Sequence, residues 1–202
     1  MSEPSSDDRV TWWNEAYDEG NVPWDVGRPQ AELVAVEQTN RIDGRILDVG
    51  CGTGVEARYL ADAGYEVVGL DFSESAIEVA RKRTDSEAVS FVVGDALELS
   101  TSDLGSFDTV LDCGMLHTLE GQDRAAYVGE LASVLGDGGR AVCLEFGADA
   151  PEDWGPTPLS AGEMQRIFDD GWTLDVIEPV PFETQQRPVP GILGIAERTS
   201  ER

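Results

Sequence analysis

The sequence predicts an α/β fold in which a mostly parallel sheet is covered by helices on both faces. Short apolar runs of strand length alternate along the chain with segments of helical periodicity. A glycine-rich turn, Gly50-Cys51-Gly52-Thr53-Gly54, follows the first buried run and opens a helix, as in a strand-turn-helix unit. At 202 residues, the chain suits one such domain over residues 41–202, preceded by an arm over residues 1–40.

Each expected element follows from periodicity and from residues that start or stop it. In the first half we expect a helix from Pro29, a strand over 46–49, a helix over 55–62 ended by Gly64, a strand over 66–70, a helix from Ser73 to about Arg83 and a strand within 91–96 that ends in Asp95. In the second half we expect a strand over 107–112, a helix over 123–135 stopped by the glycines from Gly136, a strand over 141–146, a helix from Ser160 through Phe168, and strands over 172–177 and 191–197.

Two carboxylates stand beside the glycine turn. Asp48 lies just before it, and Asp71 ends the second strand, 21 residues after Gly50. A carboxylate in the position of Asp71 can accept hydrogen bonds from both hydroxyls of a ribose. Asp48 would repel the pyrophosphate of a dinucleotide and attract an ammonium group, and Val55 stands where the dinucleotide pattern has its third glycine. The turn therefore predicts a site for a nucleoside with a cationic tail.

With these residues the chain resembles the class I S-adenosylmethionine-dependent methyltransferases, in which an acid precedes a GxGxG turn and a second acid ends the next strand. The resemblance covers about residues 44–147 and extends more loosely over the rest. It implies S-adenosylmethionine as cofactor and a single-domain Rossmann-like, doubly wound sheet of seven strands with the last strand antiparallel. The cofactor-binding residues that we assign are Asp48, Gly50, Cys51, Gly52, Gly54, Asp71, Phe72, Asp95, Ala96, Asp112, Trp24 and Arg28.

Some of these residues have a second interpretation. By the resemblance, Asp95 at the end of the third strand contacts the adenine amino group, and Asp112 at the end of the fourth places its charge near the methionine tail or sulfonium. Both could instead form the turn after a strand, a common use of aspartate. Cys51 is a small filler rather than a nucleophile, because its loop offers no cation to activate the thiol.

Aromatic residues are concentrated in the arm, which holds Trp12, Trp13, Tyr17 and Trp24. An aromatic face stabilises a desolvated cation such as a sulfonium by about 2 kcal/mol or more, so together these rings favour a lid over the ligand. The alternative is that they only pack the arm onto the sheet.

The run from Pro23 to Gln30 resembles the arm of thiopurine-methyltransferase-like and related small-molecule methyltransferases. Residues 112–117 and Gly155-Pro156 followed by Ser160 fit the same group. Cys113 is a departure, because thiopurine S-methyltransferases carry arginine directly after the fourth-strand acid. We therefore expect phenolic, thiol, heterocyclic or chalcogen acceptors rather than thiopurine itself.

Methyl transfer from a sulfonium by in-line displacement needs positioning above all, worth ~7–11 kcal/mol, and a base only when the acceptor is a neutral hydroxyl. His117 is the only histidine and follows the carboxyl end of the fourth strand, where ligands bind in open α/β sheets. It is our candidate base. The alternative is a histidine that bonds to its loop and shapes the pocket.

The charge balance is strongly acidic, with 40 Asp and Glu against 14 Lys and Arg and a net charge of −26. Such a field repels nucleic acids and anionic membranes. It also destabilises the compact state unless salt screens it, so we expect a halophilic protein, the alternative being an ordinary acidic one.

Three scattered cysteines without a CxxC pair suggest neither a disulfide framework nor a metal site, and no signal peptide or membrane span is evident. We therefore expect a cytoplasmic enzyme with a small-molecule substrate. A noncatalytic S-adenosylmethionine sensor stays open as an alternative, and a nucleic-acid or protein methyltransferase is less favoured. The sequence does not address the oligomeric state.

Overall fold

The computed structural model describes residues 6–151 and 157–199, without the side chains of residues 6–9. The Gly155-Pro156 pair, which fits the resemblance to the thiopurine-methyltransferase-like group, lies outside the described residues. Within these limits, no helix is long and apolar enough to cross a membrane.

Seven strands form one sheet in the order β3-β2-β1-β4-β5-β7-β6, which confirms the predicted Rossmann-like, doubly wound architecture. The first five strands run parallel, and β7 is antiparallel to both of its neighbours, β5 and β6, as predicted for the last strand. The strands are β1 (Arg45–Val49), β2 (Glu66–Asp71), β3 (Val89–Val93), β4 (Phe107–Cys113), β5 (Leu135–Phe146), β6 (Trp172–Phe182) and β7 (Val189–Arg198).

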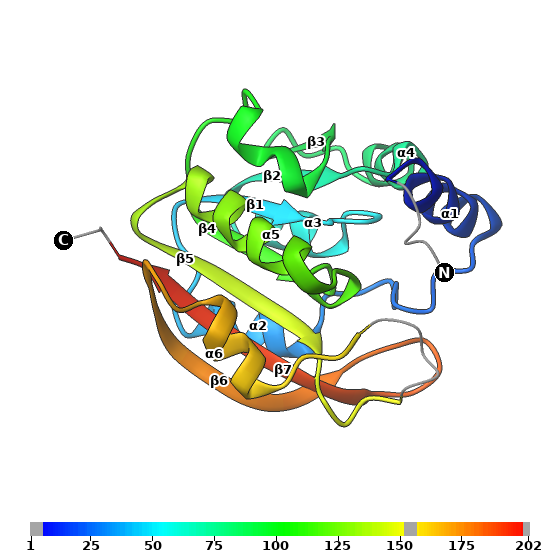
Figure 1. Cartoon of the computed structure of the whole chain (residues 1–202). Helices are drawn as coiled ribbons and strands as arrows, with labels where there is room; N and C mark the ends of the chain where they lie inside the picture. Colours follow the sequence, from blue (N-terminus) through cyan, green and yellow to red (C-terminus); the bar gives the residue numbers. More distant parts are fainter. Residues whose placement is uncertain (1–5, 152–156, 200–202) are drawn as a thin grey trace.

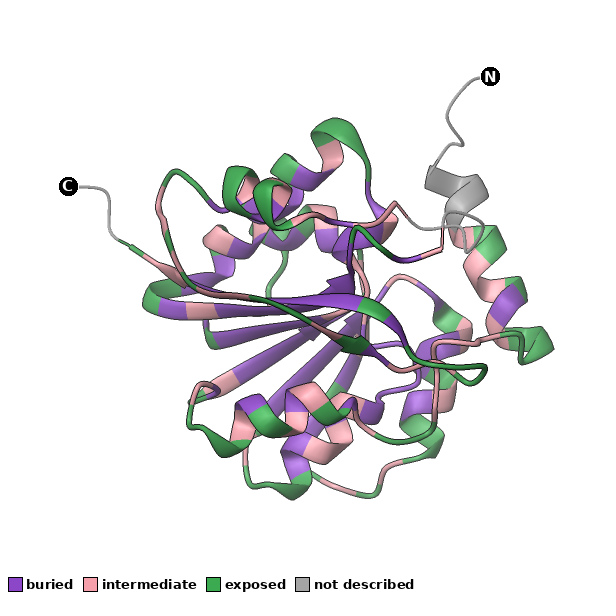
Figure 2. Ribbon diagram, turned by 90° about the horizontal axis from the view of Figure 1, so that it is seen from below, coloured by how far each residue is buried: buried purple, intermediate pink, exposed green. Residues whose placement is uncertain are grey.

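Helices cover both faces of the sheet (Figure 1). They are α1 (Ser6–Glu19), α2 (Ala31–Gln38), α3 (Val55–Asp62), α4 (Glu74–Lys82), α5 (Gly121–Val134) and α6 (Ala161–Ile167), with two 3-10 turns, η1 (Ala96–Thr101) and η2 (Leu116–Thr118). One core cluster holds apolar residues of α2, α3 and α4, and a second holds those of η1, α5 and α6. Figure 2 shows the buried strands as a layer between them.

Local signals place several helix ends. The Ser73 hydroxyl accepts the Ala76 N–H and caps α4, and Ser160 with Glu163 forms the expected capping box of α6. The helix from Val55 to Asp62 has the predicted bounds, and Gly64 follows its end with a φ of 102°.

Strand pairing moves the end of α5 and the end of β6 away from their predicted positions. The α5 helix ends at Val134, before the glycines, since Leu135 is already extended and pairs with Phe107 of β4. The β6 strand continues through two prolines to Phe182. It lies at the edge of the sheet, where proline is tolerated because one side of the strand needs no donor.

The register of the central strands positions the site. Val49 of β1 lies opposite Leu70 of β2 on one side and Asp112 of β4 on the other. The carboxyl ends of β1, β2 and β4 therefore reach the same edge of the sheet, where the residues after each strand can face one ligand.

Candidate active site

A cavity of about 540 Å³ opens at this edge, beneath the N-terminal arm. Its lining includes every sequence-predicted site residue except Gly54 and Asp112, namely Trp24, Arg28, Asp48, Gly50, Cys51, Gly52, Asp71, Phe72, Asp95, Ala96 and His117. The structure thus brings together residues from the arm, the glycine turn and the ends of β2, β3 and β4.

The glycine turn has left-handed backbone and no room for side chains. Gly50 and Gly52 have φ angles of 67° and 51°. A Cβ on Gly52 would lie 2.8 Å from the Tyr17 hydroxyl, so the arm contacts the bare turn directly. Gly54, with a φ of 73°, is the N-cap of α3, and a Cβ there would meet the Phe91 ring at 2.5 Å. Gly54 therefore serves packing between helix and sheet.

Asp71 joins the end of β2 to the turn. Its carboxylate accepts the N–H groups of Gly52 and Ser73, both at 2.9 Å. Burial raises the pKa of Asp71 to about 6, although these two amides favour the ionised form. A carboxylate held in this way keeps lone pairs for hydroxyl donors in the cavity.

Asp48 lacks a complete set of partners. Its Oδ2 is buried and meets no hydrogen-bond donor among the residues that the structure describes. Burial, followed by the charges of Glu56 and Asp112, raises the pKa of Asp48 well above its usual range. A cationic ligand would restore the ionised form, because an ammonium group supplies both the missing donor and the opposite charge.

Glu56, in the first turn of α3, is a lining residue that sequence reasoning missed. Its Oε1 accepts the Gln30 N–H at 3.2 Å, and burial raises the pKa of Glu56 to about 7. The only sequence feature that could have identified Glu56 as a lining residue is its position just after the glycine turn. With Asp48 and Asp71 it makes the cavity rich in carboxylates.

Asp112 is bonded to its own loop. One oxygen accepts the Met115 N–H at 2.8 Å, and the other accepts the Leu116 N–H and the Tyr127 hydroxyl. Burial and the neighbouring Glu145 carboxyl raise the pKa of Asp112 well above its usual range. This arrangement fits the turn-forming interpretation of Asp112, because both of its oxygens already accept hydrogen bonds within the protein.

His117 is buried beside a second acid that the sequence analysis did not select. Its Nδ1 lies 2.7 Å from Oε2 of Glu145 and accepts the Phe146 N–H at 3.1 Å. The imidazole stacks on the Phe146 ring with centroids 4.5 Å apart. Burial lowers the pKa of His117 to about 4 and raises that of Glu145 to about 7. A glutamate inside an otherwise apolar strand was the available signal for Glu145.

The arm's aromatic rings pack against one another over the turn. Trp13 contacts Trp12 and Trp24, each with centroids 4.9 Å apart, and it also contacts Phe72, which follows Asp71. The Trp24 indole N–H donates to the Tyr17 hydroxyl at 3.4 Å. The rings therefore pack the arm onto the core and also line the cavity.

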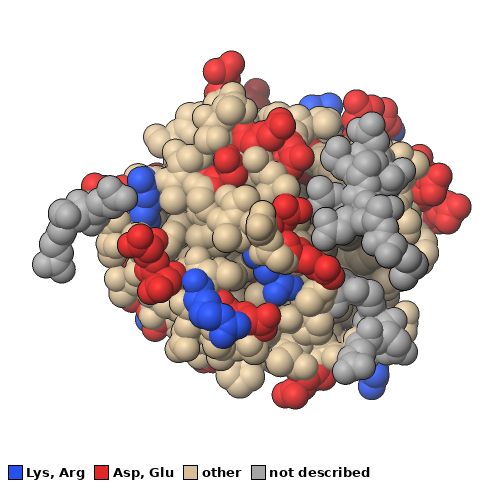
Figure 3. Space-filling view, in the orientation of Figure 1, with Lys and Arg blue, Asp and Glu red and all other residues tan. Residues whose placement is uncertain are grey.

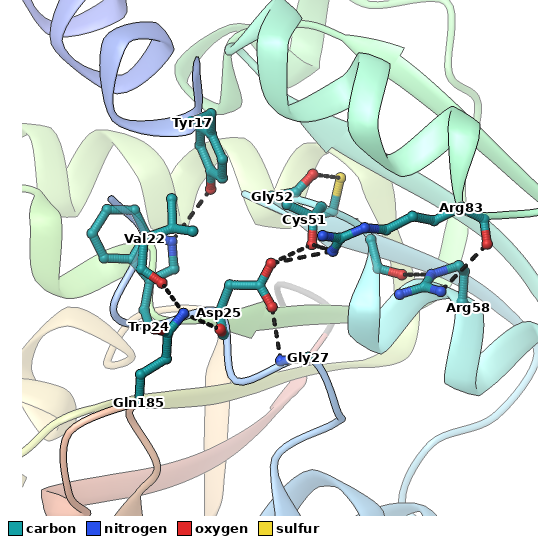
Figure 4. A network of polar contacts seen from close by, with 12 residues as sticks. Tyr17, Val22, Trp24, Asp25, Gly27, Cys51, Gly52, Arg58, Arg83 and Gln185 are labelled. Atoms are coloured by element: carbon teal, nitrogen blue, oxygen red, sulfur yellow. Dashed lines mark hydrogen bonds and ion pairs between the residues drawn. The ribbon is translucent and has the colours of Figure 1, made fainter. Parts of the chain in front are cut away.

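Polar contacts attach the arm to the core (Figure 4). Oδ2 of Asp25 accepts the Thr53 hydroxyl at 2.7 Å and pairs with Arg83 at 3.3 Å, while the Gln185 amide donates to the Asp25 carbonyl. Arg28 pairs with Glu183, which follows β6. The arm thus connects the glycine turn to the loop between β6 and β7.

The arrangement suits a ligand that combines a cation, vicinal hydroxyls and an aromatic base. The unpartnered Asp48 oxygen requires a donor, Asp71 presents acceptors, and the rings offer faces to a positive charge. The remainder of the cavity is lined by apolar and aromatic side chains, including Met115, Leu119, Phe146 and Phe182. It leaves room for a second, apolar molecule.

Comparisons with known proteins agree with this geometry. Residues 46–139 match the family model described as a methyltransferase domain. The chain is 32% identical over 161 residues to the 2-heptyl-1-hydroxyquinolin-4(1H)-one methyltransferase of Mycobacteroides abscessus, covering 78% of this chain and 71% of that one. A solved structure from work on the conversion of a disulfide bond into a thioacetal group during echinomycin biosynthesis shares 36% identity, with a TM-score of 0.79 over 88% of this chain and 85% of that one. A SAM-dependent methyltransferase from Anabaena variabilis has a TM-score of 0.81 at 18% identity, covering 98% of both chains.

Proposed function

Because this chain belongs to the class I S-adenosylmethionine-dependent methyltransferases, we propose that it methylates a small aromatic or heteroaromatic acceptor bound in the apolar half of the cavity. Its cofactor is S-adenosylmethionine. The cofactor supplies a methyl carbon whose bond to sulfur breaks, leaving its electron pair on sulfur, while the acceptor's lone pair forms the new bond. The protein's contribution is to hold the two molecules in line, because a sulfonium is already an activated donor.

The assignment of residues to the cofactor is part of the proposal. Asp48 would receive the ammonium group, since its buried Oδ2 needs a donor. Asp71 would accept the ribose hydroxyls, and Asp95 with Ala96 would border the adenine. The aromatic rings around Trp24 would cover the sulfonium, and the arm over residues 1–40 would act as the lid of the domain over residues 41–202.

The acceptor half favours a neutral molecule over an anion. Phe146 and Phe182 meet edge to face, with centroids 4.9 Å apart, and provide an apolar wall beside His117. The carboxyl of Glu56 lines the same cavity, and the arginine in its lining, Arg28, is already paired with Glu183. A hydroxylated ring suits these surroundings, and the Mycobacteroides abscessus relative is named for a hydroxylated quinolone.

A sulfur acceptor is the second candidate. The similar structure from echinomycin biosynthesis comes from work on disulfide conversion, and Cys113, which departs from the thiopurine pattern, lines the cavity here. Within the family we place the chain among small-molecule methyltransferases related to the thiopurine group, acting on a different acceptor. A noncatalytic sensor would use the same cofactor residues. We further propose that the acidic composition reflects a halophilic origin.

The test combines binding with turnover. Calorimetry should show binding of S-adenosylmethionine and none of NAD; the reverse would overturn the cofactor assignment. Release of S-adenosylhomocysteine should then be measured with phenols, hydroxyquinolines, thiols, thiopurines, halides and oxyanions. We expect turnover with the hydroxylated rings. Turnover only with thiols would favour the sulfur acceptor, and cofactor binding without release on any acceptor would favour the sensor.

A further inference from the structure

Glu145 is a fully buried carboxyl in the sheet, yet it touches a side chain that lines the cavity. It lies near the carboxyl end of β5, opposite Ile192 of β7. Its Oε2 lies 2.7 Å from Nδ1 of His117 and accepts the backbone N–H of His117 at 3.0 Å. Burying a carboxyl in a sheet costs free energy unless the group is hydrogen-bonded or its charge is paired. The position therefore calls for a chemical explanation.

The two nitrogens of His117 face different surroundings. Nδ1 is engaged by Glu145 and by the Phe146 N–H, whereas none of the described residues bonds Nε2. Because the ring lines the cavity, Nε2 is the nitrogen available to a bound acceptor. Which nitrogen carries the proton decides whether this atom accepts a proton or donates one.

The protonation state of Glu145 controls that choice. An ionised Glu145 draws a proton to Nδ1 and leaves the Nε2 lone pair free. A protonated Glu145 donates to Nδ1 and leaves the proton on Nε2, a state that the Phe146 N–H also favours because it needs a lone pair on Nδ1. Burial raises the pKa of Glu145 to about 7 and lowers that of His117 to about 4, so the carboxyl retains the shared proton more readily.

The titratable groups packed around Glu145 and His117 decide which of the two carries charge. Asp112 lies beside the Glu145 carboxyl, and because two adjacent buried carboxyls do not both ionise readily, the pKa of Asp112 is raised well above its usual range and the charge is left to Glu145. Arg124 of α5 disfavours an imidazolium and favours the carboxylate. The titratable or charged groups that face the pair are Asp112 and Cys113 of β4, Arg124 and Tyr127 of α5, Cys143 of β5, and Glu163 of α6, which pairs with Arg124.

We propose that Glu145 is the positioning residue that takes up the acceptor's proton through His117, so that the site methylates neutral, weakly acidic hydroxyls. The inference rests on the proposed methyl transfer. The acceptor's O–H bond breaks as its proton moves to Nε2, and the proton on Nδ1 moves to the Glu145 carboxylate. The imidazole is neutral again, its Nε2–H faces the acceptor oxygen, and that oxygen keeps the electron pair that attacks the methyl carbon.

The single histidine allows a direct test without any substrate. In protein labelled with 15N-histidine, NMR reports which ring nitrogen carries the proton. From about pH 5 to about pH 9 we expect a change from the Nε2–H to the Nδ1–H form centred near pH 7, where Glu145 ionises. A ring that keeps one tautomer throughout, or that becomes imidazolium near pH 6.5, its ordinary pKa, would overturn the proposal.

Variants then link the tautomer to catalysis. Glu145→Gln should abolish the transition, and its rate with a weakly acidic acceptor such as 4-methylphenol should fall roughly 100-fold or more, with a much smaller loss for 2,4-dinitrophenol, which is already ionised in solution. Glu37→Gln, whose carboxylate bonds Tyr59 and Tyr65 away from the cavity, is the matched control. Equal losses with both phenols would assign Glu145 a purely structural role.

If the Glu145→Gln variant fails to fold, the pH dependence of the wild-type rate still tests the role of Glu145. Its rate with 4-methylphenol should rise as pH passes about 7, whereas no such rise should be seen with 2,4-dinitrophenol, which is already ionised on both sides of this pH. If the protein releases no S-adenosylhomocysteine with any acceptor, the proposed function fails while the NMR transition still decides the role of Glu145. Turnover without the transition refutes the inference alone.

Discussion

Asp71 shows how one carboxylate serves the fold and the ligand at once. It accepts two backbone N–H groups that shape the glycine turn, and its remaining lone pairs face the cavity. The pKa of about 6 that burial gives it lies above the usual value for aspartate, so the ionised form is less stable here than in water. Ribose hydroxyls donating to the carboxylate would stabilise that form and lower its pKa.

Cofactor binding should therefore depend on pH. As pH falls from about 7.5 through about 6, Asp71 becomes protonated, loses acceptor capacity, and the affinity for S-adenosylmethionine should fall. Titration calorimetry in two buffers of different ionisation enthalpy should also detect proton release on binding near pH 6. Asp71→Asn should bind about 10-fold or more weakly, with a flatter pH dependence.

Asp62→Asn, at the exposed end of α3, is the matched control and should bind as the wild type does. An affinity that is constant between pH 7.5 and pH 5, or an unchanged affinity in Asp71→Asn, would contradict the assignment of the ribose to Asp71.

For single residues, the sequence predicts where a side chain lies better than it predicts which hydrogen bonds that side chain forms. Asp48, Asp71 and Asp95 could be placed at one edge because parallel strands align their carboxyl ends. The unpartnered oxygen of Asp48 and the closed set of bonds around Asp112 depend on neighbours that are distant in sequence. Glu145 was not selected because its partner, His117, comes from another loop.

At the scale of elements, the arm is held at several separate points. Asn14 of α1 accepts the Ser73 hydroxyl at 2.7 Å, at the start of α4. Gln30 exchanges two hydrogen bonds with the backbone of Glu183, at 2.9 Å and 3.0 Å. Thr53 connects Asp25 of the arm to the glycine turn. The arm is therefore anchored to the start of α4, to the glycine turn and to the residue that follows β6.

Thr53→Val tests this connection with little change in volume. The valine cannot donate to Asp25 or accept from Arg83, so segment 22–30 should loosen. Hydrogen exchange should become faster in that segment, the central strands should keep their protection, and S-adenosylmethionine should bind about 10-fold more weakly. Thr39→Val, which removes only a bond at the end of α2, is the control. Unchanged exchange over 22–30 would show that the aromatic packing alone holds the arm.

Element boundaries were predictable wherever local chemistry sets them. The helix 55–62 and the Ser73 and Ser160 caps needed only glycine, serine and periodicity. The extents of β5 and β6 were underestimated, because pairing with β4 and β7 extends the strands through glycines and prolines that read as turn residues. The two prolines inside β6 are the local signal that it lies at an edge.

At the scale of the whole molecule, the net charge of −26 is the dominant property. Figure 3 shows acidic side chains in separate clusters over the visible face, outnumbering the basic groups there. Several ion pairs exist, such as Arg45 with Glu66 and Arg140 with Asp43, but 14 basic residues cannot neutralise 40 acids. The uncompensated carboxylates repel one another, and this repulsion is relieved when the chain unfolds.

Stability should accordingly increase with salt. The screening length is about 10 Å at 0.1 M and about 3 Å at 1 M, so most of the repulsion between surface carboxylates should disappear over this range of potassium chloride. We expect the melting temperature to rise by roughly 10 °C or more, since a gain of 1 kcal/mol raises it by about 2–4 °C in a domain of this size. Sucrose at matched osmolality is the control, because it does not screen charge and separates exclusion from electrostatics. Equal melting temperatures in low and multimolar salt would make this an ordinary acidic protein and refute the halophilic origin, while the assignment of the cofactor to the buried Asp48 and Asp71 carboxylates would be unaffected by that result.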